Sequence, residues 1–430
     1  MVLVVHTSDN HLGVDKYAGS PLAVAYVDIF NEIAEKIIEV GSRYLVVAGD
    51  MFHSIDPSTD VILSAIRVLK RLKDSGVRVV VVPGNHDNST IRRGVLDVLA
   101  EAGLIHLLDY REEYDSLLLK PIVFEDDKLV FYGVPGFRGL KELGYLSKGT
   151  VKFLERNKYE NYNVVVVAHT SAKIRDYDPT RYSTRYGKIT TDEYELLRRV
   201  PPHTRYVALG HIHIPVPLEK TFESRAAYPG APIGMDASDL RETVWLAEKG
   251  VKRRVLLVDI LQDPPSIRAI ELENTPLIVH REVEVSSPSD VMNQLTKIVL
   301  ELPSEPKHKV VLLYLKNLEE LDARILGVAK EISAKRGVHI EIRLKRREEI
   351  SELFATLSQL SELIEVDVEK TLTGIETLEE KLLEDLARRY KLPIGLDKLK
   401  WILSKLSEPV PSSSKYGDLL LELEKELIEA

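Results

Sequence analysis

Short Val-rich segments alternate with amphipathic stretches along the first 260 residues. A short apolar run bounded by turn residues is typical of a buried strand, whereas apolar residues at three- and four-residue spacing indicate a helix. The alternation predicts an α/β fold in which helices cover both faces of the sheet structure. The predicted strands are Leu3–Thr7, Tyr44–Ala48, Val77–Val82, Leu129–Gly133, Val164–Ala168 and Tyr206–Leu209, and the predicted helices include Leu22–Val40, Thr59–Ser75 and Arg92–Ala102.

The order of elements changes after the turn-rich segment Asp263-Pro-Pro265. The predicted elements are then strands at Ile267–Leu272 and Leu277–Val285, a helix at Val291–Leu302, a strand at Val310–Leu315, a helix at Leu318–Arg336 and a strand at Val338–Leu344. This order predicts a small α+β domain at residues 261–346, after a first domain at residues 1–260.

From Arg347 onward the apolar residues recur at helical spacing, with breaks at Pro393 and at Pro409-Val-Pro411. A helical segment of this kind lacks a compact core of its own. We therefore expect residues 347–430 to form a helical segment that docks on another molecule.

The composition limits the chemistry and the location of the protein. The chain has no Cys, so disulfides and thiolate metal sites are excluded and any metal is held by oxygen and imidazole nitrogen. Such ligands favour Mn, Fe or Zn. No apolar run is long enough to span a bilayer, and the N-terminus lacks the basic region and cleavage site of a signal peptide. We expect a cytoplasmic protein without a membrane partner.

The net charge of -9 argues against a protein that coats nucleic acid by bulk electrostatics. It is compatible with DNA as a substrate, because bound cations and a local basic patch can supply the attraction.

Five segments that carry Asp, Asn and His begin directly after predicted strands. Strand ends at one edge of an α/β sheet converge, and this edge is where ligands bind in such folds. We therefore expect the five segments to form one site. They are Asp9-Asn-His11-Leu-Gly13, Gly49-Asp50-Met-Phe-His53, Gly84-Asn85-His86-Asp87, Ala168-His169 and Gly210-His211-Ile-His213.

These residue types fit a site for two metal ions. Phosphodiester hydrolysis needs a nucleophile at neutral pH and an offset for charge on the phosphoryl oxygens, and two cations with a bridging hydroxide provide both. Asp50 is the predicted bridging carboxylate. One metal is predicted to bind Asp9, His11 and His213, and the other Asn85, His169 and His211.

The other two histidines of these segments, His53 and His86, follow their neighbouring ligands too closely for all of these residues to bind metal. We predict that they stabilise the phosphoryl transition state or protonate the leaving alkoxide, which imidazole can do near pH 7. For Asp87 two interpretations stay open: it caps the following helix, or it orients a metal-binding imidazole.

A segment that interleaves basic and aromatic residues follows His169. Its pattern suits phosphate contacts and base stacking, although a solvated loop or a subunit contact also fits. The predicted DNA contacts are Lys173, Arg175, Arg181, Arg185 and Lys188.

The five segments resemble those of calcineurin-like metallophosphoesterases. His53 after Gly49-Asp50, together with Asp87 after Gly84-Asn85-His86, resembles the Mre-eleven nuclease branch, whose bacterial members are the SbcD proteins, and the order and spacing resemble its archaeal members. In two places the chain departs from that pattern: Thr170-Ser171 follows His169 where Gln-Gly is expected, and Ala231 follows Gly230 where Ser is usual.

The resemblance implies a sheet sandwich covered by helices, followed by a capping domain and a helical segment that binds a Rad-fifty-type (SbcC-like) ABC ATPase. It also implies a homodimer with two Mn²⁺ per subunit that repairs DNA double-strand breaks. The implied activities are 3′-to-5′ exonuclease action on duplex DNA and endonuclease action on single strands. His86 would assist departure of the leaving group, and His53 would position the phosphate.

Two other functions remain open from the sequence. The same metal site would support a phosphoesterase for small molecules or cyclic nucleotides. Alternatively, the chain is a scaffold for the ATPase with a structural metal site, although His53 and His86 are unnecessary for that purpose.

Overall fold

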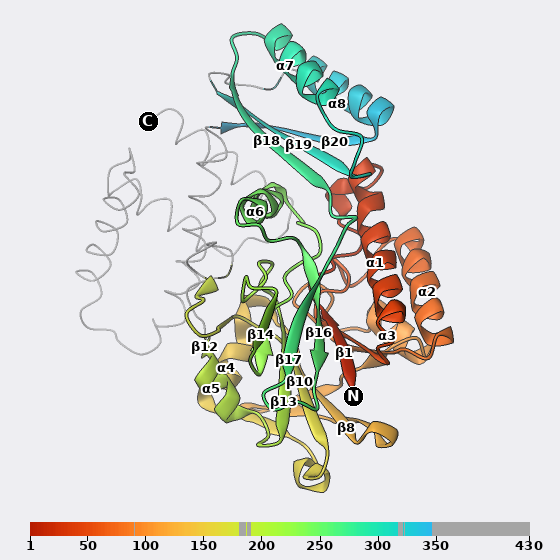
Figure 1. Cartoon of the computed structure of the whole chain (residues 1–430), viewed down its shortest axis with the longest axis vertical. Helices are drawn as coiled ribbons and strands as arrows, with labels where there is room; N and C mark the ends of the chain where they lie inside the picture. Colours follow the sequence, from red (N-terminus) through yellow and green to blue (C-terminus); the bar gives the residue numbers. More distant parts are fainter. Residues whose placement is uncertain (90, 180–185, 187–190, 317–320, 322, 346–430) are drawn as a thin grey trace, which may run out of the picture. The chain divides into compact units, whose positions relative to one another are not determined.

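The computed structural model describes residues 1–89, 91–179, 186, 191–316, 321 and 323–345 (Figure 1). The chain divides into two compact units, residues 1–342 and residues 343–430. The predicted helical segment at residues 347–430 lies outside the described residues. No described helix is both long enough and apolar enough to cross a membrane.

A seven-stranded sheet forms the first layer of the larger unit. Its strand order is β14 (Thr221–Glu223), β17 (Ser266–Glu271), β16 (Arg254–Asp259), β1 (Leu3–Thr7), β2 (Tyr44–Ala48), β3 (Arg78–Val82) and β4 (His106–Leu107). The strands from β1 to β4 run parallel, whereas β16 pairs antiparallel with β1.

A five-stranded sheet forms the second layer. Its order is β15 (Ala226–Ala227), β13 (Thr204–Gly210), β10 (Asn163–His169), β8 (Leu129–Val134) and β7 (Ile122–Phe124). Val46 and Val80 of the first sheet share one buried cluster with Phe131 and Val165 of the second. The two sheets therefore pack face to face, which confirms the predicted sandwich.

Helices cover the outer faces of both sheets. Phe30 of α1 (Pro21–Glu39) and Leu69 of α2 (Thr59–Asp74) share the core of the seven-stranded sheet with α3 (Val95–Glu101). Leu143 of α4 (Lys141–Lys148) and Leu196 of α5 (Glu193–Arg199) share the core of the five-stranded sheet. Pro21 at the first position of α1 fits a helix start, because its missing N–H needs no partner there.

A smaller α+β layer follows within the same compact unit. It contains a three-stranded sheet of β18 (Leu277–Glu284), β19 (Lys309–Lys316) and β20 (Val338–Leu344), with helices α7 (Pro288–Leu300) and α8 (Ala323–Arg336). The predicted strand at Ile267–Leu272 is β17, which pairs with β16 in the large sheet. Its placement in the small domain is therefore wrong, and the small sheet begins at β18.

Short elements that the sequence analysis does not predict complete the large unit. They are β5 (Tyr110–Glu113), β6 (Ser116–Leu119) and β9 (Val151–Phe153), which form a three-stranded sheet, the pair β11 (Ala172–Lys173) and β12 (Thr191–Asp192), and helix α6 (Ala237–Glu248).

Candidate metal centre

The five predicted segments meet at the carboxyl ends of β1, β2, β3, β10 and β13. Backbone hydrogen bonds join the first two loops: the Asp9 N–H donates to the Gly49 carbonyl at 3.0 Å, and the His11 N–H donates to the Asp50 carbonyl at 2.9 Å. The backbone N–H of His211 donates to the Asp9 carboxylate at 3.1 Å. The convergence that the sequence predicts is therefore present.

Asp9, His11 and His213 form the first group. Each offers one possible ligand atom, and these atoms all lie within 4.8 Å of one another. The Nε2 atoms of His11 and His213 are 3.3 Å apart. Two nitrogens bound to one ion at about 2.1 Å each lie roughly 3.0–3.4 Å apart. The spacing of this buried group therefore fits one divalent cation.

Asn85, His169 and His211 form the second group. The Asn85 Oδ1 atom lies 3.0 Å from His169 Nε2 and 3.3 Å from His211 Nδ1. The Asp50 Oδ2 atom lies 3.4 Å from His169 Nε2 in this group and 3.8 Å from His11 Nε2 in the first. Asp50 thus lies between the two groups, where a bridging carboxylate belongs.

Hydrogen bonds on the far side orient two of these imidazoles. The Nδ1–H of His169 donates to the Ala48 carbonyl at 2.9 Å, and the Nδ1–H of His213 donates to Asp239 Oδ2 at 2.5 Å. Because Nδ1 donates a hydrogen bond in each ring, Nε2 is the nitrogen that faces the site, as metal binding requires.

Asp239 is a functional residue that the sequence analysis misses. Its carboxylate also accepts the N–H of Met235 at 2.9 Å and the guanidinium of Arg253 at 3.1 Å. Arg253 is itself fully buried and donates to the His213 carbonyl at 2.5 Å. This network fixes the position of His213 through both its ring and its backbone.

Unusual backbone conformations are concentrated at the site. Asp9, His11, Asp50 and His211 have φ values of 53°, 45°, 50° and 93°, in the region that residues other than Gly rarely adopt. Such conformations persist where the surroundings impose them, and they are often found at functional sites. Gly84 provides space in addition, because a Cβ atom there would collide with the Asp50 carboxylate.

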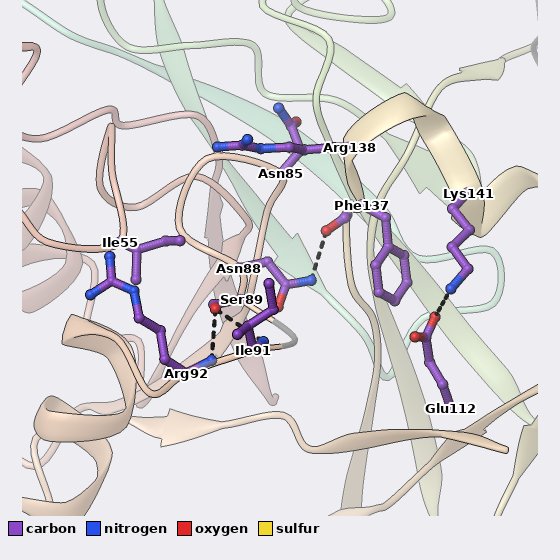
Figure 2. Close-up of a pocket in the computed structure, with 11 residues that line it drawn as sticks. Ile55, Asn85, Asn88, Ser89, Ile91, Arg92, Glu112, Phe137, Arg138 and Lys141 are labelled. Carbon is purple, nitrogen blue, oxygen red and sulfur yellow. Dashed lines mark hydrogen bonds and ion pairs between the residues drawn. The ribbon is translucent and has the colours of Figure 1, made fainter. Parts of the chain in front are cut away.

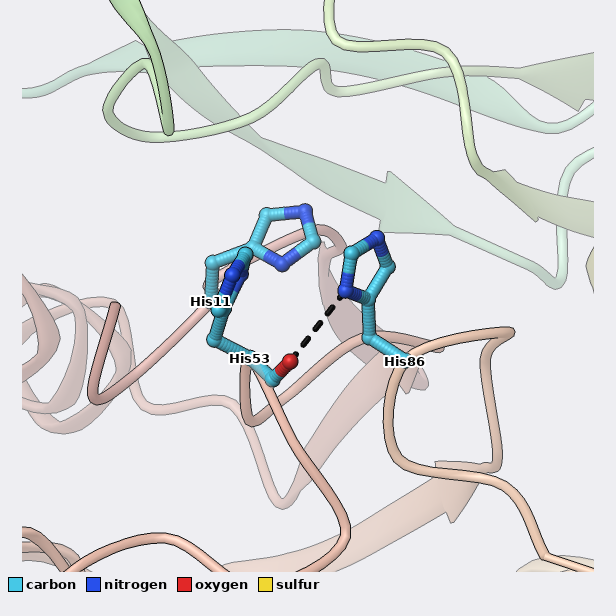
Figure 3. Close-up of side chains that lie close together, drawn as sticks. All are labelled: His11, His53 and His86. Carbon is cyan, nitrogen blue, oxygen red and sulfur yellow. Dashed lines mark hydrogen bonds between the residues drawn. The ribbon is translucent and has the colours of Figure 1, made fainter. Parts of the chain in front are cut away.

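His53 and His86 lie beside the first group (Figure 3). Their ring centroids are 4.8 Å apart, and they lie 5.4 Å and 4.9 Å from the ring centroid of His11. The Nδ1–H of His86 donates to the His53 carbonyl at 3.1 Å, which leaves Nε2 of His86 available. The three imidazoles also offer nitrogens within 4.8 Å of one another. The catalytic assignment of His53 and His86 therefore stays a prediction.

Burial shapes the charge state of the site. Burial lowers the pKa of His11 well below its ordinary value, and burial with the nearby His169 lowers the pKa of His211 to about 3. Neutral imidazoles are the form that binds a cation. Burial also opposes charge on His169, but Asp50 and Asp9 outweigh it and raise its pKa to about 10. Without a bound cation His169 is therefore protonated on both nitrogens, and a cation that neutralises these carboxylates would release the proton from Nε2.

Residues 2–215 match the model of the calcineurin-like phosphoesterase family. The matched region contains all seven predicted metal ligands, which the structure brings together where strand ends of the two packed sheets meet. The chain belongs to this family.

Curated relatives of this phosphoesterase are named as DNA double-strand break repair proteins or as a nuclease subunit. The chain is 29% identical to the DNA double-strand break repair protein Mre11 of Archaeoglobus fulgidus, over 81% of this chain and 75% of that protein. It is 27% identical to the Mre11 protein of Methanopyrus kandleri, over 58% of this chain and 52% of that protein. It is 25% identical to the SbcD component of the nuclease SbcCD from Bacillus subtilis, over 60% of this chain and 66% of that protein.

Asp87 has neither of the two roles considered from the sequence. Its carboxylate accepts the N–H of Gly84 at 2.8 Å and the N–H of Phe52 at 3.1 Å. It thereby ties together the two loops that carry Asp50 and Asn85. Burial, together with the charge of Asp50, raises the pKa of Asp87 to about 7.

The predicted DNA-contact segment of the phosphoesterase is described in part. Lys173 is half-buried in β11, whereas Arg181, Arg185 and Lys188 lie outside the described residues. The guanidinium of Arg175 donates to the Glu223 carbonyl and lies 5.8 Å from the centroid of the Phe222 ring.

Tyr186 of the same segment is buried, and its hydroxyl accepts the N–H of His213 at 2.9 Å. Its ring is therefore unavailable for the base stacking that the sequence pattern suggests. It supports a ligand loop instead.

The two departures from the Mre-eleven pattern also support ligand loops. Thr170 is buried, and its hydroxyl donates to Glu142 at 3.1 Å. The N–H of Ala231 donates to the His213 carbonyl at 3.0 Å. In this phosphoesterase these positions stabilise the surroundings of His169 and His213.

Proposed function

We propose that this phosphoesterase is a metal-dependent DNA nuclease that processes double-strand breaks. The observation that carries the proposal is the convergence of two ligand groups around Asp50, with His53 and His86 beside them. The names of the Mre11 and SbcD relatives support DNA as the substrate. We further propose two Mn²⁺ per subunit as the physiological metals, because the ligand set contains oxygen and imidazole nitrogen without sulfur.

Each residue of the site has a definite task in this proposal. When bound, two divalent cations supply a hydroxide nucleophile and offset negative charge on the phosphoryl oxygens. Asp9, His11 and His213 would hold one cation, Asn85, His169 and His211 would hold the other, and Asp50 would contact both. His86 is held by the His53 carbonyl and delivers a proton from Nε2 to the leaving alkoxide. His53 lies beside it and helps to position the phosphate.

The finer activity and the assembly follow the family pattern. We propose 3′-to-5′ exonuclease action on duplex DNA and endonuclease action on single strands. We also propose a homodimer, and a complex in which residues 347–430 bind a Rad-fifty-type ABC ATPase. Residues 261–346, without β17, would serve as the capping domain that contacts DNA, with Lys173, Arg175, Arg181, Arg185 and Lys188 as further contacts.

The test compares two substrates in the presence of Mn²⁺: end-labelled duplex DNA and bis(p-nitrophenyl) phosphate, a small phosphodiester. The proteins are the wild type, His86→Ser, and the control His203→Ser, which changes an exposed histidine before β13 at the opposite edge of the sheet. We expect the wild type and the control to cleave DNA. We expect His86→Ser to cleave it at least about 100-fold more slowly, a typical loss when a general acid is removed.

The result also separates the alternatives. Turnover of the small phosphodiester without DNA cleavage by the wild type would contradict the nuclease proposal and favour a small-molecule enzyme. Cleavage of neither substrate, with retained binding to the ATPase, would favour a scaffold.

A further inference from the structure

A pocket of about 400 Å³ lies beside the metal centre and shares Asn85 with it. Figure 2 shows Ile55 and Arg92 on one side of this pocket, and Phe137 and Lys141 on the other. The pocket is lined by Ile55, Ile91, Arg92, Phe137, Arg138 and Lys141, among other residues.

Gly136 connects the wall of the pocket to the metal centre. Its N–H donates to the Pro83 carbonyl at 2.9 Å, and its carbonyl accepts the Asn88 side-chain N–H at 2.9 Å. A Cβ atom at this position would collide with the imidazole of His169 and would lie 2.9 Å from the backbone nitrogen of Asn85. The pocket wall therefore packs directly on two predicted ligand residues, and its position relative to them is fixed.

Glu142 makes a second connection between this wall of the pocket and the metal-ligand loop. Its buried carboxylate accepts the N–H of Phe137 at 3.1 Å and the hydroxyl of Thr170 at 3.1 Å. Thr170 directly follows His169. The segment that carries Phe137 and Arg138 is thus tied to the metal-ligand loop by a second connection.

Three cations line the pocket of this acidic protein. Arg92 pairs with Asp56, and Lys141 pairs with Glu112 at 2.7 Å, a residue that also lines the pocket. Arg138 is exposed and has no ion-pair partner within the described part of the chain. An unpaired guanidinium beside a phosphodiesterase centre provides a binding group for a phosphate of the substrate strand.

The pocket also has an apolar side. Ile55 and the highly exposed Ile91 lie opposite Phe137, whose ring is buried in the core of the five-stranded sheet (Figure 2). Proteins that bind single strands combine cations for the backbone with aromatic side chains on which the bases stack. In this pocket Ile55 and Ile91 offer an apolar surface in that place. A volume of about 400 Å³ lies in the usual range for small-ligand pockets, about 300–1,000 Å³, and has room for one nucleotide.

We propose that this pocket binds one unpaired nucleotide next to the scissile phosphodiester, with Arg138 on its phosphate and Ile55 and Ile91 beside its base. The inference rests on the proposed nuclease function and specifies how that site takes a single strand. Arg138 is a positioning residue for the substrate.

The test uses the full chain with Mn²⁺ and two substrates: a single-stranded oligonucleotide and bis(p-nitrophenyl) phosphate, which has no neighbouring phosphate. The variants are Arg138→Ala, Arg138→Lys and the control Lys128→Ala, an exposed cation that precedes β8 at the opposite edge of the sheet. We expect Arg138→Ala to lower kcat/KM for the oligonucleotide about tenfold, and to change turnover of the small phosphodiester less than about twofold, because one phosphate contact is lost. Arg138→Lys should recover much of the loss, and Lys128→Ala should behave as wild type.

Binding and a modified substrate give independent readouts. A plot of log affinity for the oligonucleotide against log salt concentration has a negative slope. Its magnitude should be about 0.7 smaller in Arg138→Ala than in the wild type. An abasic nucleotide next to the cleaved bond should weaken binding of the oligonucleotide to the wild type. It should weaken binding to Arg138→Ala by the same factor, because the base contact and the phosphate contact are separate.

Failure of this inference is distinguishable from failure of the proposed function. If the wild type hydrolyses the small phosphodiester but no oligonucleotide, the nuclease proposal is wrong. If the wild type cleaves the oligonucleotide and Arg138→Ala cleaves it equally well, the pocket inference is overturned and the nuclease proposal stands. An equal loss on both substrates would assign Arg138 to the metal centre and would likewise overturn the inference.

Discussion

His213 donates its Nδ1 proton to Asp239 at 2.5 Å, so that its Nε2 atom faces His11. We predict that Asp239→Asn weakens metal binding by about 10- to 100-fold, the usual effect of removing a partner that orients a ligand histidine. Activity should return at high metal concentration, because the ligand itself remains. Titration of metal by calorimetry and activity as a function of Mn²⁺ concentration measure both effects.

Asp236→Asn is the matched control for that prediction. Asp236 caps the N-terminus of α6, the helix that contains Asp239, and its side chain accepts the N–H of Asp239 at 2.9 Å. Asn is an equally good cap. The control should bind metal as wild type does. Equal metal affinity in Asp239→Asn and wild type would show that the contact with His213 does not tune the site.

A methyl group at Gly84 should disrupt the metal centre. We predict that Gly84→Ala lowers the metal content and removes cleavage, because its Cβ atom would collide with the Asp50 carboxylate. Gly144→Ala in α4 is the control, since nothing lies within 4 Å of a Cβ atom there and Ala favours a helix. Metal content is measured by inductively coupled plasma spectrometry. Full occupancy in Gly84→Ala would mean that Asp50 is free to move away.

The contact between α1 and the segment before β19 should make stability depend on pH. Asp28 accepts bonds from Lys307 at 2.6 Å and from His308 at 2.8 Å. Burial favours the neutral acid, but these two partners outweigh it and hold the pKa of Asp28 below its ordinary value of 3.8. A depressed pKa stabilises the fold above the unfolded-state pKa, and this contribution is lost as the pH falls through the folded-state pKa.

We therefore predict that Asp28→Asn lowers the melting temperature by about 1–2 °C at neutral pH, and that the difference from wild type shrinks below about pH 4. Asp115→Asn, in the exposed turn between β5 and β6, should have no such effect. Scanning calorimetry from pH 7 to pH 3 measures the difference. A difference that grows as the pH falls would contradict the assigned sign.

Truncation after Arg347 tests the proposed partner segment. We predict that the truncated protein loses binding to a Rad-fifty-type ABC ATPase and keeps metal-dependent cleavage, because residues 1–342 form a compact unit by themselves. Co-purification and the cleavage assay measure the two properties. Unchanged binding to the ATPase would place the docking surface elsewhere.

The strands that carry the candidate site follow from local sequence pattern. Leu3–Thr7 and Tyr44–Ala48 begin and end where the sequence predicts them, because continuous apolar runs between turn residues mark strands buried on both faces. Convergence of the segments within each sheet then follows from the geometry of parallel strands. The meeting of the ends of β10 and β13 with those of β1, β2 and β3 depends on the packing of the two sheets, which no local pattern shows. The role of β17 is different: its own sequence cannot show that it pairs with β16 in the large sheet.

Tertiary contacts also explain why Asp239 and Arg253 escape prediction. The segment Asp236-Ala-Ser-Asp239 has the pattern of an ordinary helix start, and the bond from Asp239 to His213 joins residues 26 positions apart. A buried Arg is uncommon and carries no local pattern at all. A histidine that binds metal needs an acceptor for the N–H of its other ring nitrogen. This requirement is the signal that could have indicated a carboxylate such as Asp239.

An anomalous difference map from crystals grown with Mn²⁺ is the most direct test of the two-metal site. We predict two peaks about 3.5–4 Å apart, the usual spacing of a two-metal site. One peak should touch Asp9, His11 and His213, the other should touch Asn85, His169 and His211, and Asp50 should contact both. A single peak, or a second peak among His11, His53 and His86, would contradict the two-metal phosphodiesterase site.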